Sequence, residues 1–170
     1  MKQKKQTRRV TKKHESGRSM IEMVGVLAVM GLITAAAFVL ITSAMRSQKL
    51  SRADDDIAAL AAGIRLLYNN TDNFSGVTSA NVLKVLGFDQ VKAPYGGAAY
   101  EVAAATESTA GDRFTISFET GDATTCAGLQ GRTWANGGQA KCVAGTNDNS
   151  KLQIWFGRDG ETVTIPTSGN

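Results

Sequence analysis

The sequence predicts an α+β fold in which one long N-terminal helix packs on an antiparallel sheet. The first observation is an uncharged, strongly apolar run from Met23 to Met45. The second is an apolar stripe at helical spacing that continues this run as far as Leu67. The third is a series of short strand-like segments, separated by turns, in the second half of the chain. We therefore expect a helix whose hydrophobic first half protrudes from a head built on about four strands.

Positive charge is concentrated at the N-terminus. Residues 1–17 contain seven lysines and arginines together with Glu15, a net charge of +6, whereas the whole chain carries +4. The rest of the chain is therefore slightly acidic, which argues against a nucleic-acid surface on the head. A basic segment with so few apolar residues cannot bury a core. Beside a membrane-spanning segment it keeps the N-terminus in the cytoplasm.

The apolar run could serve as a membrane anchor or as a signal peptide. Its length of about 20 residues is enough to cross the hydrocarbon core of a bilayer. Thr42, Ser43 and Ala44 form an acceptable signal-peptidase site, so a secretory signal removed after Ala44 is an alternative. Glu22 argues against that alternative, because an acidic side chain at the start of the run costs free energy in a membrane. A discarded signal would gain nothing from it.

The helical pattern continues beyond the apolar run. Apolar residues recur at steps of three and four residues and form one stripe, namely Leu50, Ala53, Ile57, Leu60, Ile64 and Leu67. The opposite face carries charged residues, namely Arg52, Asp54, Asp55, Asp56 and Arg65. Three consecutive aspartates on a helix point about 100° apart, so they cannot converge on a metal ion. We expect one helix from Met20 to Tyr68, with its second half lying on the head.

Two short helices are expected after this long one. The first is N-capped by Ser79 and followed by Gly87, a residue suited to the left-handed conformation at a helix end. The second covers Ala123–Leu129 and begins after Gly121 and Asp122.

Four strands are expected in the same half of the chain. Two are predicted over residues 100–104 and 114–118, joined through residues 108–112. Two more, over residues 152–156 and 162–165, flank the turn-forming sequence at 157–160 and are predicted to form a hairpin.

The chain contains two cysteines, Cys126 and Cys142. Their spacing matches neither a zinc knuckle nor a redox CxxC pair. In an exported domain an even number of cysteines favours a structural disulfide, and two buried free thiols are the alternative. The only histidine, His14, lies in the basic leader, so the head has no histidine for a metal site or a catalytic triad. We expect no enzymatic activity, no cofactor and no metal.

The residues from Gly17 to Glu22 resemble the processing motif of type IV prepilins. In that family a glycine ends a basic leader, the next residue becomes a methylated N-terminus, and a glutamate stands fifth in the mature chain. Gly17, Arg18 and Glu22 match these three positions. Arg18 stands where the family usually has an apolar residue. The long leader and the sequence at 94–97, together with the asparagine-rich loop before it, look most like type IVb pilins of the bundle-forming and conjugative thin-pilus kind.

The resemblance implies a sequence of processing and assembly. A prepilin peptidase would remove the leader, residues 1–17, and leave a hydrophobic transmembrane and polymerisation helix over residues 18–45 and a pilin head over 46–170. The carboxylate of Glu22 would then pair with the new α-amine of Arg18 on a neighbouring subunit. A buried carboxylate is costly unless it is paired, so the pair would set the register between subunits.

The function implied by the resemblance is that of a structural pilus subunit. The precursor would reside in the bacterial inner membrane, with a cytoplasmic N-terminus and a periplasmic head. Its partners would be the peptidase, the pilus assembly machinery and further copies of itself, in an extracellular filament used for adhesion, aggregation or mating contact. The alternatives are a minor pilin, a pseudopilin of type II secretion, or a secreted or membrane-anchored binding domain that does not polymerise.

Overall fold

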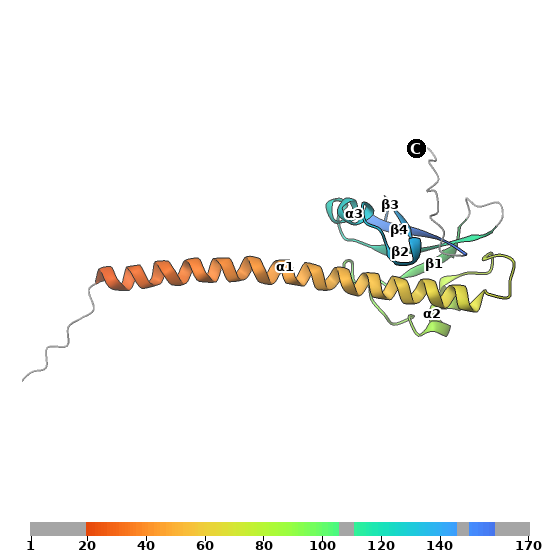
Figure 1. The fold of residues 1–170 in the computed structure, drawn as a ribbon, viewed down its shortest axis with the longest axis horizontal. Helices are drawn as coiled ribbons and strands as arrows, with labels where there is room; N and C mark the ends of the chain where they lie inside the picture. The colour runs from red at the N-terminus through yellow and green to blue at the C-terminus, as the bar shows by residue number, and fades with distance from the viewer. Residues whose placement is uncertain (1–19, 106–110, 146–149, 159–170) are drawn as a thin grey trace, which may run out of the picture. The chain divides into compact units, whose positions relative to one another are not determined.

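A computed structural model describes residues 20–105, 111–145 and 150–158, and it confirms the α+β class. The chain divides into two compact units, residues 1–44 and residues 45–170. The long helix runs without interruption from the first unit into the second. The elements in chain order (Figure 1) are α1 (Met20–Leu67), α2 (Ser79–Leu86), β1 (Glu101–Ala104), β2 (Arg113–Glu119), α3 (Ala123–Gln130), the 3-10 turn η1 (Ala135–Gly137), β3 (Gln139–Ala144) and β4 (Ser150–Gly157).

The described residues of the head form an antiparallel sheet with the strand order β1-β2-β4-β3. Its two central strands are aligned so that Phe114 lies opposite Phe156 and Ile116 lies opposite Ile154. These four side chains are fully buried and belong to the core between the sheet and α1. The alternation of strand side chains therefore places one sheet face against the helix, as expected for a helix-on-sheet layer.

The second half of α1 supplies the helix side of this core. Ala53, Ile57, Leu60 and Ile64 are fully buried, as the apolar stripe predicts. Leu67, the last residue of the helix, is 44 % exposed, and the prediction for it is wrong.

Three of the charged residues opposite the apolar stripe of α1 are half-buried and form hydrogen bonds with the head. The Nε–H of Arg65 donates to the carbonyl oxygen of Gly157 at 3.1 Å. Asp54 accepts a hydrogen bond from the backbone N–H of Ala135 at 3.2 Å, and Asp56 accepts one from the hydroxyl of Tyr100 at 2.9 Å. The physical reason is position: residues about 100° from the buried stripe lie at its border. From there their polar ends reach groups on the head.

Tyr100, the partner of Asp56, is deeply buried. Its side chain is 1 % exposed, and burial, followed by the hydrogen bond to Asp56, raises the pKa of its hydroxyl. The hydroxyl is therefore a neutral donor, and its bond to a charged acceptor anchors α1 to the start of β1.

Helix α2 begins with a different cap from the one predicted. Thr78, rather than Ser79, accepts a hydrogen bond from the N–H of Asn81. The hydroxyl of Ser79 instead accepts from the N–H of Val102 at 2.8 Å and donates to its carbonyl at 3.0 Å. Ser79 therefore bonds to Val102, far along the chain, and does not cap the helix. Gly87 ends the helix with φ 74°, as predicted.

Strand β3 was not predicted, and it changes the pairing of β4. Residues Ser150–Gly157 have β2 along one edge and β3 along the other. Both edges of β4 are therefore occupied, and neither is left for the predicted hairpin partner, residues 162–165. Residues 162–165 themselves lie outside the described part of the chain. Gly138 leads into β3 where a Cβ atom would lie 2.6 Å from Cε1 of Phe156, so only glycine fits without displacing the ring.

Candidate functional site: an exposed apolar helix and a disulfide-bonded head

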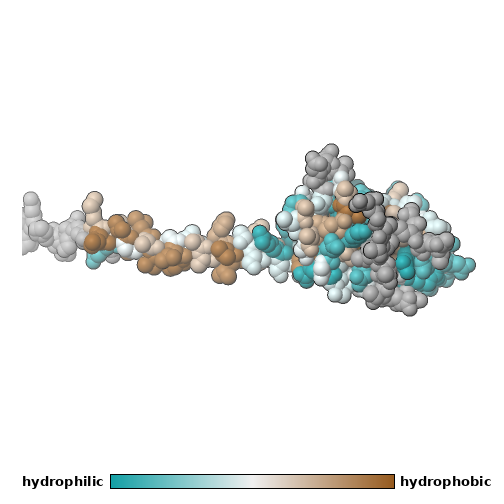
Figure 2. Space-filling model, turned by 90° about the horizontal axis from the view of Figure 1, so that it is seen from above, coloured by the Kyte–Doolittle hydropathy of each residue, from teal (hydrophilic) through white to brown (hydrophobic). Residues whose placement is uncertain are grey.

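The first half of α1 exposes its apolar side chains on all sides. Every residue from Met20 to Ala44 is exposed, including Leu32 at 73 % and Phe38 at 69 %, and hydrophobic residues dominate this stretch in Figure 2. Within the described residues, α1 is the one helix whose length and composition would allow it to span a membrane. Apolar surface on this scale is rare on a soluble monomer, so it needs lipid or other protein chains to cover it.

Two hydroxyl groups of this stretch are satisfied inside the helix. The hydroxyl of Thr34 donates to the carbonyl oxygen of Met30 at 2.8 Å, and the hydroxyl of Thr42 donates to that of Val39 at 2.9 Å. Such internal bonds suit a helix surrounded by hydrocarbon, where water cannot provide partners.

Two glycines interrupt the large side chains of the exposed stretch. A Cβ atom added to Gly25 or to Gly31 would meet nothing within 4 Å. Packing inside the subunit therefore does not require glycine at either position. Small residues at such places allow another helix to approach closely.

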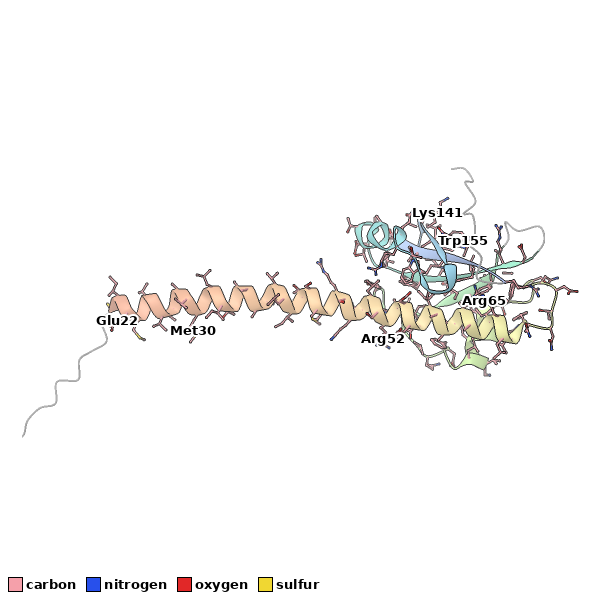
Figure 3. The ribbon with its side chains drawn as sticks, in the orientation of Figure 1. Glu22, Met30, Arg52, Arg65, Lys141 and Trp155 are labelled. Carbon is pink, nitrogen blue, oxygen red and sulfur yellow. A yellow bond between two sulfur atoms is a disulfide. The ribbon has the colours of Figure 1, made fainter. Side chains whose placement is uncertain are left out.

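Glu22 carries the charge at the start of this helix. It lies in the first turn of α1 (Figure 3), where the positive end of the helix dipole favours a carboxylate. Among the described residues it forms no ion pair. Gly17 and Arg18 lie outside the described residues, so the cleavage site and the pairing of Glu22 with the amine of Arg18 stay predictions.

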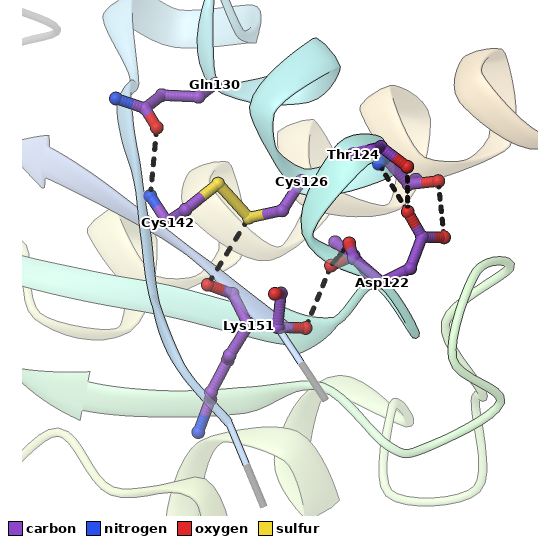
Figure 4. Close-up of a disulfide and its surroundings, with 9 residues drawn as sticks. Asp122, Thr124, Cys126, Gln130, Cys142 and Lys151 are labelled. Atoms are coloured by element: carbon purple, nitrogen blue, oxygen red, sulfur yellow. Dashed lines mark hydrogen bonds between the residues drawn. A yellow bond between two sulfur atoms is a disulfide. The ribbon is translucent and has the colours of Figure 1, made fainter. Parts of the chain in front are cut away.

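The predicted disulfide joins Cys126 of α3 to Cys142 of β3, with Cα atoms 5.9 Å apart (Figure 4). Cys126 is fully buried, and its sulfur lies 3.7 Å from the carbonyl oxygen of Lys151. The side chain of Gln130, at the end of α3, accepts a hydrogen bond from the N–H of Cys142 at 3.4 Å. The bridge thus ties α3 to β3, an edge strand of the sheet.

Asp122 sets the start of α3. Its carboxylate accepts hydrogen bonds from the hydroxyls of Thr124 and Thr125 and, at 2.7 Å, from the N–H of Thr125. These bonds, with the one from the Thr124 side chain foremost, lower its pKa to about 2. The residue is therefore an ionised N-cap at neutral pH. It begins the helix four residues before Cys126 and so helps to orient the disulfide.

We expect replacement of both cysteines by serine to destabilise the head. The bridge closes a loop between positions 16 residues apart, for which the chain-entropy model gives about 3 kcal/mol of stabilisation. Denaturant unfolding of the full chain in detergent would measure the change. Reduction of the unmodified protein should cause a similar loss and should leave the double variant unchanged. Equal stability of the oxidised and reduced proteins would contradict this prediction.

A polar cavity on the head was not predicted. It is lined partly by α1 and partly by the loop before η1, and these segments meet through the bond between Asp54 and Ala135, which are 81 positions apart. No local pattern in the sequence signals such a pairing. In the part of the chain that the structure describes, no three histidine, cysteine or acidic residues are arranged to hold a metal ion.

No protein-family model, curated protein or solved structure matches the chain.

Proposed function

We propose that this chain is a type IV pilin-like subunit, most similar to type IVb pilins, that polymerises through the first half of α1 into an extracellular filament. The observation that carries the proposal is a continuous helix whose first half is apolar, wholly exposed and headed by one carboxylate, and whose second half is built into a disulfide-bonded head. A helix of this composition has two natural environments, a bilayer and the interior of a polymer.

Before assembly the helix would anchor the subunit in the bacterial inner membrane. The uncharged run of about 20 residues matches the hydrocarbon thickness, and the basic leader would hold the N-terminus on the cytoplasmic side. Glu22 would then lie at the start of the span, close to the interface, where a carboxylate is less costly than at the bilayer centre.

Cleavage after Gly17 by a prepilin peptidase would prepare the subunit for assembly. It removes the leader, with a net charge of +6, and creates an α-amine on Arg18, four residues before Glu22. In the filament the carboxylate of an incoming subunit would face the amine of a neighbour. Pairing two charges in an apolar interior is far less costly than burying one alone, so one axial offset between subunits would be preferred.

The glycines of the exposed stretch fit polymerisation better than simple anchoring. Gly25 and Gly31 have open space around them in the single subunit. Close approach of neighbouring helices would fill this space and gain dispersion contacts. An anchor surrounded only by lipid has no need of small residues at these positions.

The mature N-terminus tests the proposal directly. In cells that contain a prepilin peptidase, we expect mass spectrometry of the mature protein to find a chain that begins at Arg18, with or without a methyl group. A Gly17→Val variant should retain the leader and serves as the control. A chain that begins at Met45 would show that the helix is a discarded signal. A chain that keeps its leader in the presence of active peptidase would instead indicate an anchored domain that does not polymerise.

A further inference from the structure

A cationic groove lies between α1 and the turn at Pro94. Its volume is about 280 Å³, and it is lined by Met45, Gln48, Lys49, Arg52 and Pro94. All five residues belong to the folded unit of residues 45–170. Two of them are basic and none is acidic. The groove therefore suits a negatively charged group on the molecule that covers it.

Lys49 carries the unpaired charge of this groove. The guanidinium group of Arg52 lies 4.0 Å from the carboxylate of Asp56, four residues further along the helix. Lys49, in contrast, is exposed and forms no ion pair with another described residue. Its ammonium group is therefore free to bind a carboxylate from another molecule.

Asp55 is the matching unpaired acid on the same helix. Its neighbours Asp54 and Asp56 accept hydrogen bonds from the head, whereas Asp55 is exposed and has no ion pair among the described residues. At 3.6 residues per turn it lies about 160° around α1 from Ala53 and from Ile57, which are both fully buried. Its carboxylate therefore points away from the sheet.

The spacing of Lys49 and Asp55 favours a contact that repeats from subunit to subunit. They are six positions apart in the sequence, which corresponds to about 9 Å along the helix and about 120° around it. One neighbouring helix cannot face both sides at once, so a subunit needs two neighbours to satisfy both charges. A contact between two different surfaces of the same chain is heterologous, and it builds a filament where it does not close into a ring.

Little bulk follows Asp55 on the outward side of α1. Ala59 and Ala62 come after it at steps of four and three residues, and both are exposed. The distance between two packed helices depends on the size of the side chains at the contact. Another subunit can therefore approach this side of the helix closely enough to reach the carboxylate of Asp55.

We propose that the groove of one subunit binds Asp55 of the next, so that Lys49 and Asp55 form an ion pair in the filament. The two copies would be parallel and displaced by about 9 Å along α1. An exposed ion pair contributes little in water, but Met45 and Pro94 would shield this one from solvent. Charge complementarity would then select this displacement over others. The inference rests on the filament of the proposed function and is independent of the pairing of Glu22.

Reversal of the charges tests the contact in cells. We expect Asp55→Lys to reduce the amount of sheared filament about tenfold or more, because two cations would then face each other at every contact. Lys49→Asp should have the same effect, and the double variant with both changes should recover most of the filaments. Asp89→Lys, the same reversal on an exposed residue outside α1, is the control and should have no effect. Thermal unfolding of each variant in detergent should match that of the unmodified chain.

A carbodiimide, which joins an ammonium group directly to a carboxylate, tests the contact in unmodified filaments. We expect multimers on a denaturing gel and, by mass spectrometry, linked peptides that join Lys49 to Asp55. A Lys49→Arg variant keeps the positive charge but cannot form this amide, so it should assemble into filaments that lack the link.

Three results would overturn the inference. They are filaments at the normal level from Asp55→Lys, a folded double variant that recovers no filaments, and cross-linked unmodified filaments without the link between Lys49 and Asp55. In each case, unmodified filaments whose subunits begin at Arg18 would leave the proposed function intact. An unmodified chain that forms no filaments would refute both proposals.

Discussion

Cells that produce the Glu22→Leu variant are expected to insert and process the subunit normally but to carry few or no filaments. Leucine joins Met20 and Ile21 to the apolar run, so the helix should enter the membrane at least as readily. What is lost is the carboxylate that would pair with the α-amine of a neighbouring Arg18, and an amine left unpaired in an apolar interior is strongly unfavourable. The measurement is the amount of subunit in sheared surface filaments relative to the amount in the membrane.

Two further substitutions at the same position separate charge from shape. Glu22→Gln keeps nearly the same size and polarity without the charge, and it should reduce filaments almost as strongly as leucine does. Glu22→Asp keeps the charge on a side chain one methylene shorter, and it should retain more filaments than glutamine. Filaments at the normal level from the leucine and glutamine variants would rule out the pairing role of Glu22.

The Ile57→Ala variant is expected to lower the free energy of unfolding of the head by about 2–5 kcal/mol. Ile57 is fully buried in the core between α1 and the sheet, and its truncation removes apolar contacts and leaves a cavity. A loss of this size is a large fraction of the total stability of a domain. Denaturant or thermal unfolding of the full chain in detergent would measure it.

The matched control is Ile33→Ala in the first half of the same helix. Ile33 is 62 % exposed, so the same truncation should change the stability of the head by less than about 0.5 kcal/mol. Its effect should instead appear in the filament, where the side chain would be covered by other subunits. Equal losses of head stability from the two variants would contradict the division of α1 into a core-forming half and an exposed half.

Much of the fold could be predicted because its signals are local. The helix predicted from Met20 to Tyr68 ends one residue earlier, at Leu67, since the apolar stripe of its second half recurs at the helical period of 3.6 residues. Gly87 and Asp122 mark helix ends through their own backbone and side-chain chemistry. The disulfide between Cys126 and Cys142 was expected from the number of cysteines and the inferred export of the domain.

The errors occur where a distant partner overrides a local preference. Ser79 has the right chemistry for an N-cap, but its hydroxyl bonds to the backbone of Val102 and leaves the cap to Thr78. Strand β3 contains glutamine and lysine and has little strand character of its own. It forms a strand because its backbone pairs with β4, and the disulfide from Cys142 to Cys126 ties it to α3.

By itself, the sequence determined the helix, its division into an exposed apolar half and an amphipathic half, and the single carboxylate at its start. These properties depend on the spacing and chemistry of neighbouring residues, which are the same in any context. Only the tertiary structure decided the order of the strands, the bonds from Asp54, Asp56 and Arg65 to the head, and the cavity beside Trp134. Each of these depends on groups far apart in the chain, and no local pattern records which of them will meet.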